Sequence, residues 1–248
     1  KFDYFSQDEK NRLSVFASAA NTDRDSYYGP GNDPLKAYGK TTDLTAMGGA
    51  QYVHTFDKCF FMPSDLTAGL EYNRDRLKDN MWGYDRHTDQ TVNIYSAFLQ
   101  NEWKNDRWGI LIGGRLDKHN MVDNVIFSPR ANLRFNPTQN INLRLSYSSG
   151  FRAPQAFDED MHIENVGGTV AMIERAKNLK EEKSQSFSAS ADMYHRFGVF
   201  QTNFLIEGFY TRLTDVFVLG EPYDRGDGIL VKTRSNGPGA KVMGLTLE

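Results

Sequence analysis

The side chains that could carry catalysis or bind a metal are few in this sequence and widely spaced. The histidines are His54, His87, His119, His162 and His195. None has the His-x-His or His-Glu-x-x-His spacing of a metal centre, although His87 and His162 fall in predicted loops, where either could ligate haem iron or another metal. The acidic run Asp158–Asp160 offers oxygen ligands to Ca²⁺ and is equally typical of a solvated loop. The sequence therefore predicts no metal site.

Nucleophilic and redox chemistry are equally sparse. The chain has one cysteine, Cys59, which excludes an internal disulfide and a multi-cysteine zinc or iron–sulfur site. No nucleophile elbow, catalytic-triad order or recognisable pair of catalytic carboxylates is present. The Gly-x-Gly runs at 29–31 and 237–239 predict turns, because no helix follows them as a phosphate-binding loop requires. The sequence predicts that the protein is not an enzyme and holds no cofactor.

Composition excludes two classes of protein. The 248 residues include 29 Lys+Arg and 32 Asp+Glu, a net charge of −3, so no basic surplus points to nucleic acid as a partner. No apolar stretch approaches the roughly 20 residues of a membrane-spanning helix, which excludes a helical membrane protein. A transmembrane β-barrel stays possible, because its alternating strands keep mean hydropathy low.

Most of the chain alternates apolar and polar residues with the period of two that is typical of β-strands. The pattern is clear at Ile141–Tyr147, where Ile, Leu, Leu and Tyr interleave with Asn, Arg and Ser. It recurs at 66–73, 108–117, 131–135, 186–193 and 203–211. Val166–Lys177 is the segment in which a helical turn or two is expected, inside a loop. The predicted fold class is all-β.

Short and long connections alternate along the chain. Short turns are expected near 6–11, 57–64, 104–107, 136–140 and 198–199. Long polar connections are expected near 24–42, 74–90, 118–128, 150–183 and 215–237. This order predicts an antiparallel up-and-down transmembrane β-barrel with short periplasmic turns and long outer loops. The segments of about 10 to 16 residues suit tilted membrane-spanning strands better than soluble ones, and about eleven strands are expected, the first and last incomplete.

Two other readings use the same alternation. A soluble all-β ligand- or glycan-binding module would pack its apolar faces together in a dry centre, and a passive porin or adhesin barrel would share the membrane. Aromatic residues flank the predicted short turns, as Trp103 and Phe135 do, and this position predicts an interfacial girdle. Together with the connections and strand lengths, it favours a barrel whose apolar side chains face lipid and whose charged side chains line a wet interior.

Two runs in the second half of the chain resemble a known family. The runs Tyr147–His162 (YSSGFRAPQAFDEDMH) and Ala176–Ser190 (AKNLKEEKSQSFSAS) resemble the barrel region of TonB-dependent outer-membrane receptors, particularly those of Bacteroidetes. In that family a GFRAP-like stretch ends one strand, and an NLKPE-S element opens the next after a long outer loop. In this sequence the residue is Glu182, at or near the position where the family often has a proline. Further strands of the family resemble the segments 68–75, 95–104, 128–135 and 239–248.

The resemblance implies a barrel of about 22 strands that is filled by an N-terminal plug. It implies import of a large scarce nutrient, such as a ferric siderophore or cobalamin, across the outer membrane of a Gram-negative bacterium. The implied partners are outer-membrane lipid, a small-molecule or metal-chelate ligand and a periplasmic TonB protein that pulls on an N-terminal box. No segment resembles the plug or the box, so residues 1–248 are expected to be a partial β-barrel domain without a plug.

The same resemblance places ligand contacts in the outer loops and upper lumen. Aromatic side chains there offer flat apolar contact, and arginines offer a cation for an anionic chelate. The candidate ligand-binding residues are Tyr27, Tyr28, Trp82, Tyr84, Arg86, Arg152, Tyr223 and Arg225, with Tyr38, His87 and His162 in the same loops. For each of them, packing within its own loop is the competing role.

Overall fold

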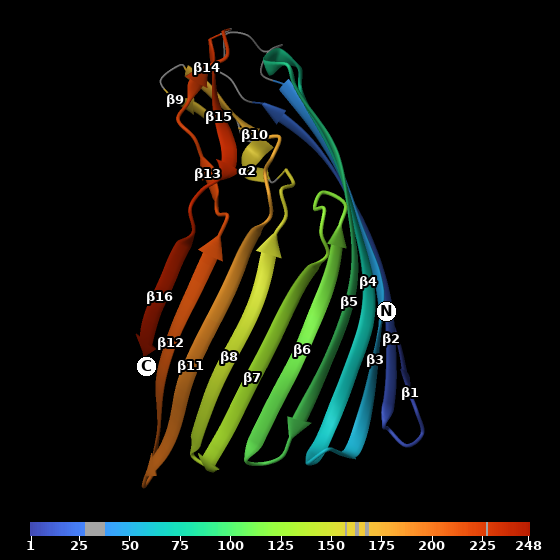
Figure 1. Ribbon diagram of the computed structural model, residues 1–248, viewed down its shortest axis with the longest axis vertical. Coiled ribbons are helices and arrows are strands. Elements are labelled where there is room, and N and C mark those ends of the chain that lie inside the picture. The colour runs from blue at the N-terminus through green and yellow to red at the C-terminus, as the bar shows by residue number, and fades with distance from the viewer. Residues whose placement is uncertain (28–37, 157, 162–163, 167–168, 227) are drawn as a thin grey trace.

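The chain folds into one long curved sheet that carries a smaller sheet above one end (Figure 1). The computed structural model describes residues 1–27, 38–156, 158–161, 164–166, 169–226 and 228–248. The large sheet consists, in spatial order, of β1 (Phe2–Phe5), β2 (Asn11–Tyr27), β3 (Tyr38–Cys59), β4 (Met62–Met81), β5 (Arg86–Lys104), β6 (Trp108–His119), β7 (Ile126–Thr138), β8 (Ile141–Arg152), β11 (Glu182–Phe197), β12 (Phe200–Thr214) and β16 (Ala240–Leu247).

The small sheet is built from the two longest connections. It contains β9 (Glu164–Val166), β10 (Thr169–Arg175), β13 (Phe217–Leu219), β14 (Tyr223–Asp224) and β15 (Ile229–Asn236). β10 and β15 run parallel, and the other pairs are antiparallel. Two single-turn helices, η1 (Trp82–Tyr84) and α2 (Asp158–Met161), lie at the same end. Within the described residues, neither is long and apolar enough to cross a membrane.

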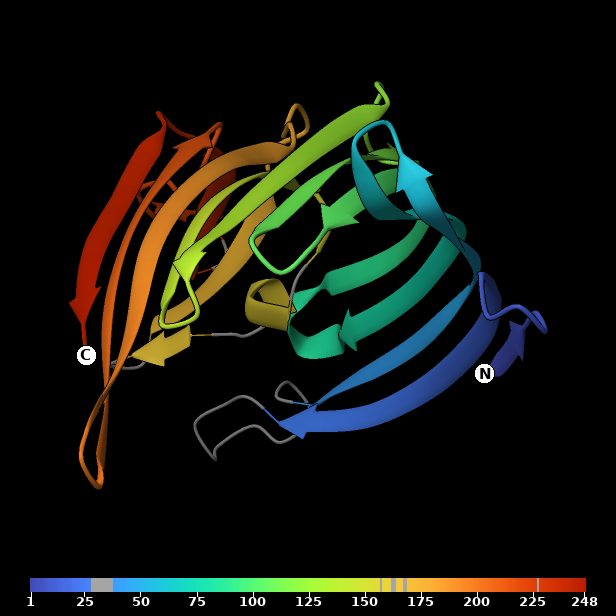
Figure 2. The ribbon, with the colours of Figure 1, turned by 90° about the horizontal axis from the view of Figure 1, so that it is seen from below.

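The predicted antiparallel up-and-down arrangement is confirmed. Every neighbouring pair of the large sheet is antiparallel, and short turns join the strands at the lower end of Figure 1. The turn between β11 and β12 consists of Gly198 and Val199, and Gly198 takes the positive φ of 61° that a tight hairpin uses. Seen from below, the sheet is an open trough (Figure 2): in the described part of the chain, β1 and β16 form its two edges.

Two sequence-based expectations are wrong. The segment 74–90 is not a long loop, because β4 continues to Met81 and β5 begins at Arg86. Polar residues occupy both faces of this upper hairpin, so it shows no alternation in the sequence. The helical turn or two expected within Val166–Lys177 does not occur in its described residues, because β10 occupies Thr169–Arg175 and pairs with β15. That pairing joins residues about 60 positions apart, which no local pattern reveals.

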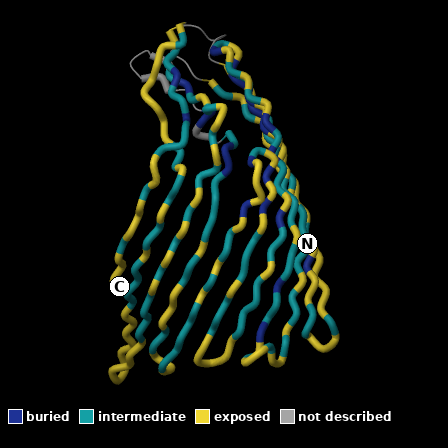
Figure 3. Tube along the Cα trace, viewed as in Figure 1, coloured by how far each residue is buried: buried dark blue, intermediate teal, exposed yellow. Residues whose placement is uncertain are grey.

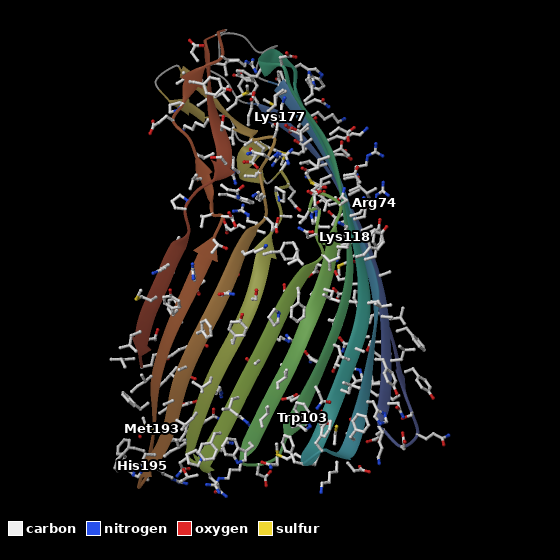
Figure 4. All side chains as sticks on the ribbon, in the orientation of Figure 1. Arg74, Trp103, Lys118, Lys177, Met193 and His195 are labelled. Atoms are coloured by element: carbon white, nitrogen blue, oxygen red, sulfur yellow. The ribbon has the colours of Figure 1, made fainter. Side chains whose placement is uncertain are left out.

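The apolar side chains of the large sheet face outward. Leu70, Leu99, Leu145 and Phe187 are between 51% and 65% exposed, whereas buried residues lie mainly towards the upper end (Figure 3). Arg74 lies on the same face of β4 as Leu70 and points away from the trough (Figure 4). The exposure of these leucines contradicts the soluble module, in which they would pack in a dry centre. It fits a surface that faces lipid.

The opposite face carries a charged network. Arg115 Nη1 contacts Glu71 Oε2 at 2.7 Å, and Arg115 Nε contacts Asp117 Oδ1 at 2.8 Å. The Ser96 hydroxyl donates to the same Asp117 oxygen at 2.6 Å. Charges held together in this way suit the hydrated interior of a wide barrel.

Aromatic side chains form a band at the short-turn end of the outward face. The ring of Trp103 stacks on Phe61 at 5.7 Å, and that of Trp108 stacks on Phe135 at 4.2 Å. The Trp103 Nε1–H donates to the Cys59 carbonyl at 3.0 Å. Trp103 lies just above the lower turns in Figure 4, at the level where aromatic side chains meet lipid headgroups.

Candidate functional site

A buried ion pair shapes the tip of the β4–β5 hairpin. Asp85 takes a left-handed conformation (φ 50°) after η1 and turns the chain back on itself. Arg86, the first residue of β5, then places Nη2 2.7 Å from Asp79 Oδ2, and their side chains are only 11% and 2% exposed. The Thr41 hydroxyl of β3 donates to the other Asp79 oxygen at 2.6 Å. Three strands therefore fix the position of Arg86.

The same arginine joins the hairpin to the β8–β11 connection. Arg86 Nη2 donates to the backbone carbonyl of Met161, at the end of α2, at 2.8 Å. A small apolar cluster of Met81, Tyr84 and Met172 packs nearby, with Ile229 against it. The hairpin tip, α2, β10 and β15 thus form one packed unit at the upper end of the trough.

Two further arginines face each other across the parallel β10–β15 pair. Arg175 lies opposite Arg234, whose Nη2 contacts Asp160 Oδ1 at 2.8 Å. Arg175 Nη1 donates to Gln90 Oε1 at 2.6 Å and to the Pro154 carbonyl at 3.2 Å. Burial lowers the pKa of the Arg175 guanidinium, and Arg234 acts in the same direction against the opposing effect of Asp160. Arg175 is therefore a half-buried cation held by neutral oxygens.

These elements enclose a cavity of about 330 Å³. Three of its lining side chains are Arg86, Arg175 and Arg225, and Arg225 Nη2 also donates to the Tyr84 carbonyl at 3.2 Å. The remaining lining residues are Asp85, His87, Thr88, Ala156, Asp160, Met161, Met172, Ile173 and Glu174. Among the described residues, Arg175 has no carboxylate in ion-pair contact. The carboxylates of Asp85, Asp160 and Glu174 also line the cavity, and Arg175 is a cation there that an anionic group can contact without displacing a carboxylate partner.

The structure brings only some of the predicted site residues to this cavity. Arg86 and Arg225 line it, and Tyr84 contributes its carbonyl and its buried ring beside them. Sequence reasoning missed Arg175, which lies in the long connection expected near 150–183. The only signal was an arginine within a loop; its position opposite Arg234 depends on strand pairing between two separate connections.

Other predicted residues lie elsewhere at the upper end. Tyr27 packs edge-on against Tyr38 with ring centroids 5.2 Å apart, at the ends of β2 and β3. Trp82 and Tyr223 are exposed. Arg152 lies over the ring of Phe217, 5.5 Å from its centroid, where β8 leaves the large sheet. None of these five residues lines the cavity.

The histidine candidates gather no metal centre in the described residues. His87 lines the cavity, where its Nδ1 is 2.9 Å from Asn80 Oδ1. Over the described part of the chain, no three His, Cys, Asp or Glu side chains lie together in a metal-binding group. Tyr28 and His162 fall outside the described residues.

Solved structures share this fold. The ferric enterobactin receptor of Pseudomonas aeruginosa, in complex with enterobactin, has a TM-score of 0.72 and 18% identity, over 99% of this chain and 40% of its own. The siderophore receptor PirA of Pseudomonas aeruginosa gives 0.69 and 14%, over 96% and 47%. The FrpB iron transporter of Neisseria meningitidis gives 0.67 and 14%, over 99% and 40%. The chain thus spans less than half the length of these structures.

The family comparison covers the whole chain. Residues 1–248 match the family described as TonB dependent receptor-like, beta-barrel. A comparison with curated proteins found no match. The chain therefore belongs to the β-barrel family of TonB-dependent receptors, which lie in the outer membrane of Gram-negative bacteria.

Proposed function

We propose that the protein is an outer-membrane receptor that imports an anionic metal chelate of the siderophore class. The observation that carries the proposal is the arginine-lined cavity at the upper end of the trough, above an interior lined by charged side chains. Siderophore and iron receptors among the similar structures support the same substrate class. Cobalamin is the alternative nutrient, and no feature of the cavity favours it.

We also propose that transport depends on TonB and that residues 1–248 supply part of a larger barrel. Comparable structures are more than twice as long as this chain, and the two edge strands of the trough are open to further pairing. In this proposal the plug and the TonB-contacting box belong to other segments of the full-length protein. Ligand uptake by cells should then require both TonB and the proton-motive force.

Ligand binding by the full-length receptor tests the site. Replacing Arg175 with Gln removes the cation that has no carboxylate in ion-pair contact among the described residues, and R225Q removes another arginine that lines the cavity. We expect each to weaken binding of ferric enterobactin, taken as the probe, by about tenfold or more, because charge-assisted contacts are the strong ones. The matched control is R196Q, since Arg196 lies at the short-turn end of β11 and donates to the Gly198 carbonyl.

Intrinsic tryptophan quenching in detergent measures that affinity, and heat-modifiable gel mobility checks folding. Equal affinity in R175Q, R225Q and R196Q would contradict a role for the cavity. Tighter binding of cobalamin than of the ferric chelate would favour the alternative nutrient. Uptake that persists after deletion of TonB would instead indicate a passive barrel.

A further inference from the structure

Three cations stand together on the outward face of the last strands of the sheet. Arg212 of β12 lies directly opposite Lys241 of β16. Lys183 of β11 lies opposite Thr214, which is two residues beyond Arg212 on β12. All three are exposed. They alternate along their strands with the same parity as the outward-facing Phe187 and Tyr210, so they share the lipid-facing side. These residues are called the outer basic patch below.

Among the described residues, two of the three cations in the outer basic patch have no carboxylate partner. Like charges placed directly opposite each other across two strands are destabilising. Lys183 has an ion pair with Glu181 at 3.0 Å, whereas within the described residues neither Arg212 nor Lys241 contacts a carboxylate. An anion from outside the chain would therefore offset the repulsion between Arg212 and Lys241.

The depth of the outer basic patch places it at the headgroup level. A row of aromatic rings lies just below it, at Tyr147, Phe187 and Tyr210, with the first two centroids 4.8 Å apart. The lower row on the same strands is Phe197 and Phe200. Ten residues separate Phe187 from Phe197; at roughly 3.3 Å per residue and a tilt of about 40°, they span the roughly 25 Å of an apolar band. The outer basic patch thus lies above that band, on the long-loop side.

Two hollows meet at the aromatic row. The upper one, of about 540 Å³, is lined by Lys183, Arg212 and the acidic Glu181, together with polar groups of Ser149, Gln185 and Thr214. The lower one is an apolar groove of about 980 Å³ on the lipid-facing side. Tyr147 lines both hollows.

Small residues open the groove. Ala189 lies opposite Gly208, and bulkier side chains such as Leu145 and Met243 border them. The groove lies inside the apolar band, where lipid chains are the surrounding medium. An apolar groove beneath a polar hollow matches a molecule with one anionic head and several hydrocarbon chains.

We infer that this face is a specific binding site for an anionic lipid of the outer leaflet, one with a phosphorylated headgroup and several acyl chains. Arg212 offers a planar fork to phosphate oxygens, and Lys183 and Lys241 add point charges on either side. The acyl chains lie in the groove over Ala189 and Gly208. The site lies outside the barrel and does not depend on which nutrient the receptor imports.

Native mass spectrometry of the full-length receptor in detergent tests this inference with diphosphoryl lipid A as the probe. We expect the double variant R212Q/K241Q to lose about tenfold or more in affinity, since each basic side chain near a headgroup contributes substantially. The matched control is R74Q/R76Q: Arg74 and Arg76 are exposed on the outward face above Tyr72, on β4, and line neither hollow. The control should bind as the unmodified protein does.

A second variant tests the groove without changing charge. A Cβ built at Gly208 has its nearest neighbours at 3.9 Å, so a side chain begins there without a clash, and Gly208 lines the groove into which a larger side chain extends. We expect G208L to weaken binding of diphosphoryl lipid A severalfold and to leave ferric-chelate uptake unchanged. Dephosphorylated lipid A and phosphatidylcholine should bind the unmodified protein at least tenfold more weakly.

Three outcomes would overturn the inference. The first is equal lipid A affinity in R212Q/K241Q and R74Q/R76Q, which would make the outer basic patch an ordinary solvated surface. The second is unchanged affinity in G208L. The third is complete competition by inorganic phosphate at millimolar concentration, which would show that a free anion, without chains, is the occupant.

Discussion

Arg86 and Asp79 form a buried charged contact that reaches the candidate site. Removing one partner of a buried pair leaves the other charge without compensation, which is strongly destabilising. We expect R86Q to destabilise the tip of the β4–β5 hairpin by about 3–5 kcal/mol. Hydrogen–deuterium exchange of the full-length receptor should show faster exchange across residues 79–90.

Lys78 and Asp89 provide the matched pair for this experiment. They lie opposite each other on the same hairpin, their charged atoms are 3.7 Å apart, and their side chains are 47% and 63% exposed. Exposed pairs contribute little, so K78Q should change exchange by less than about 1 kcal/mol. Comparable exchange in K78Q and R86Q would mean that the buried pair does not hold the hairpin.

At this scale the sequence identifies residue types but not their partners. Arginines and aromatics in predicted loops led to Arg86 and Arg225, both of which line the cavity. The same reasoning also selects Trp82 and Tyr223, which are exposed and do not line the cavity. What separates the two groups is the burial created by α2 and β10, and that packing joins distant parts of the chain.

Among the strands, β4 and β5 show how close packing depends on glycine. A Cβ at Gly69 would lie 2.3 Å from the Phe98 ring and 3.0 Å from the Ala50 carbonyl, because that ring covers the glycine. Arg115 in turn lies 6.0 Å from the centroid of the same ring. We expect G69A to displace Phe98 and to lower the free energy of unfolding by about 1–3 kcal/mol.

The comparison variant is G208A, for which the nearest atoms lie 3.9 Å from the new Cβ. Urea titrations of the full-length receptor in lipid vesicles, followed by gel mobility, compare the two. G208A should stay within about 0.5 kcal/mol of the unmodified protein. The packing argument fails if G69A unfolds at the same urea concentration as G208A.

Element type was predictable wherever one face meets lipid and the other meets water. Ile141–Tyr147 alternates cleanly and lies in β8. Above the apolar band both faces meet water, the alternation disappears, and the upper halves of β4 and β5 were expected to be loop. The order of strands followed from the turns alone, whereas the parallel pairing of β10 with β15 has no local cause.

As a whole molecule, the trough exposes two kinds of surface that promote association with other molecules. Its outward leucines face lipid, and within the described residues β1 and β16 each leave one edge unpaired. We expect residues 1–248, produced alone, to self-associate or to require detergent. Light scattering that finds a stable monomer without detergent would contradict an open half-barrel.

The parallel contact between β10 and β15 has a consequence for how such receptors diversify. One strand comes from the β8–β11 connection and the other from the β12–β16 connection, and their register sets Arg175 beside Arg234. Replacing only one of the two connections with that of a related receptor would leave the strand in the other connection without its pairing partner. The smallest exchangeable unit is therefore both connections together, so new specificities at this rim should be inherited as matched pairs.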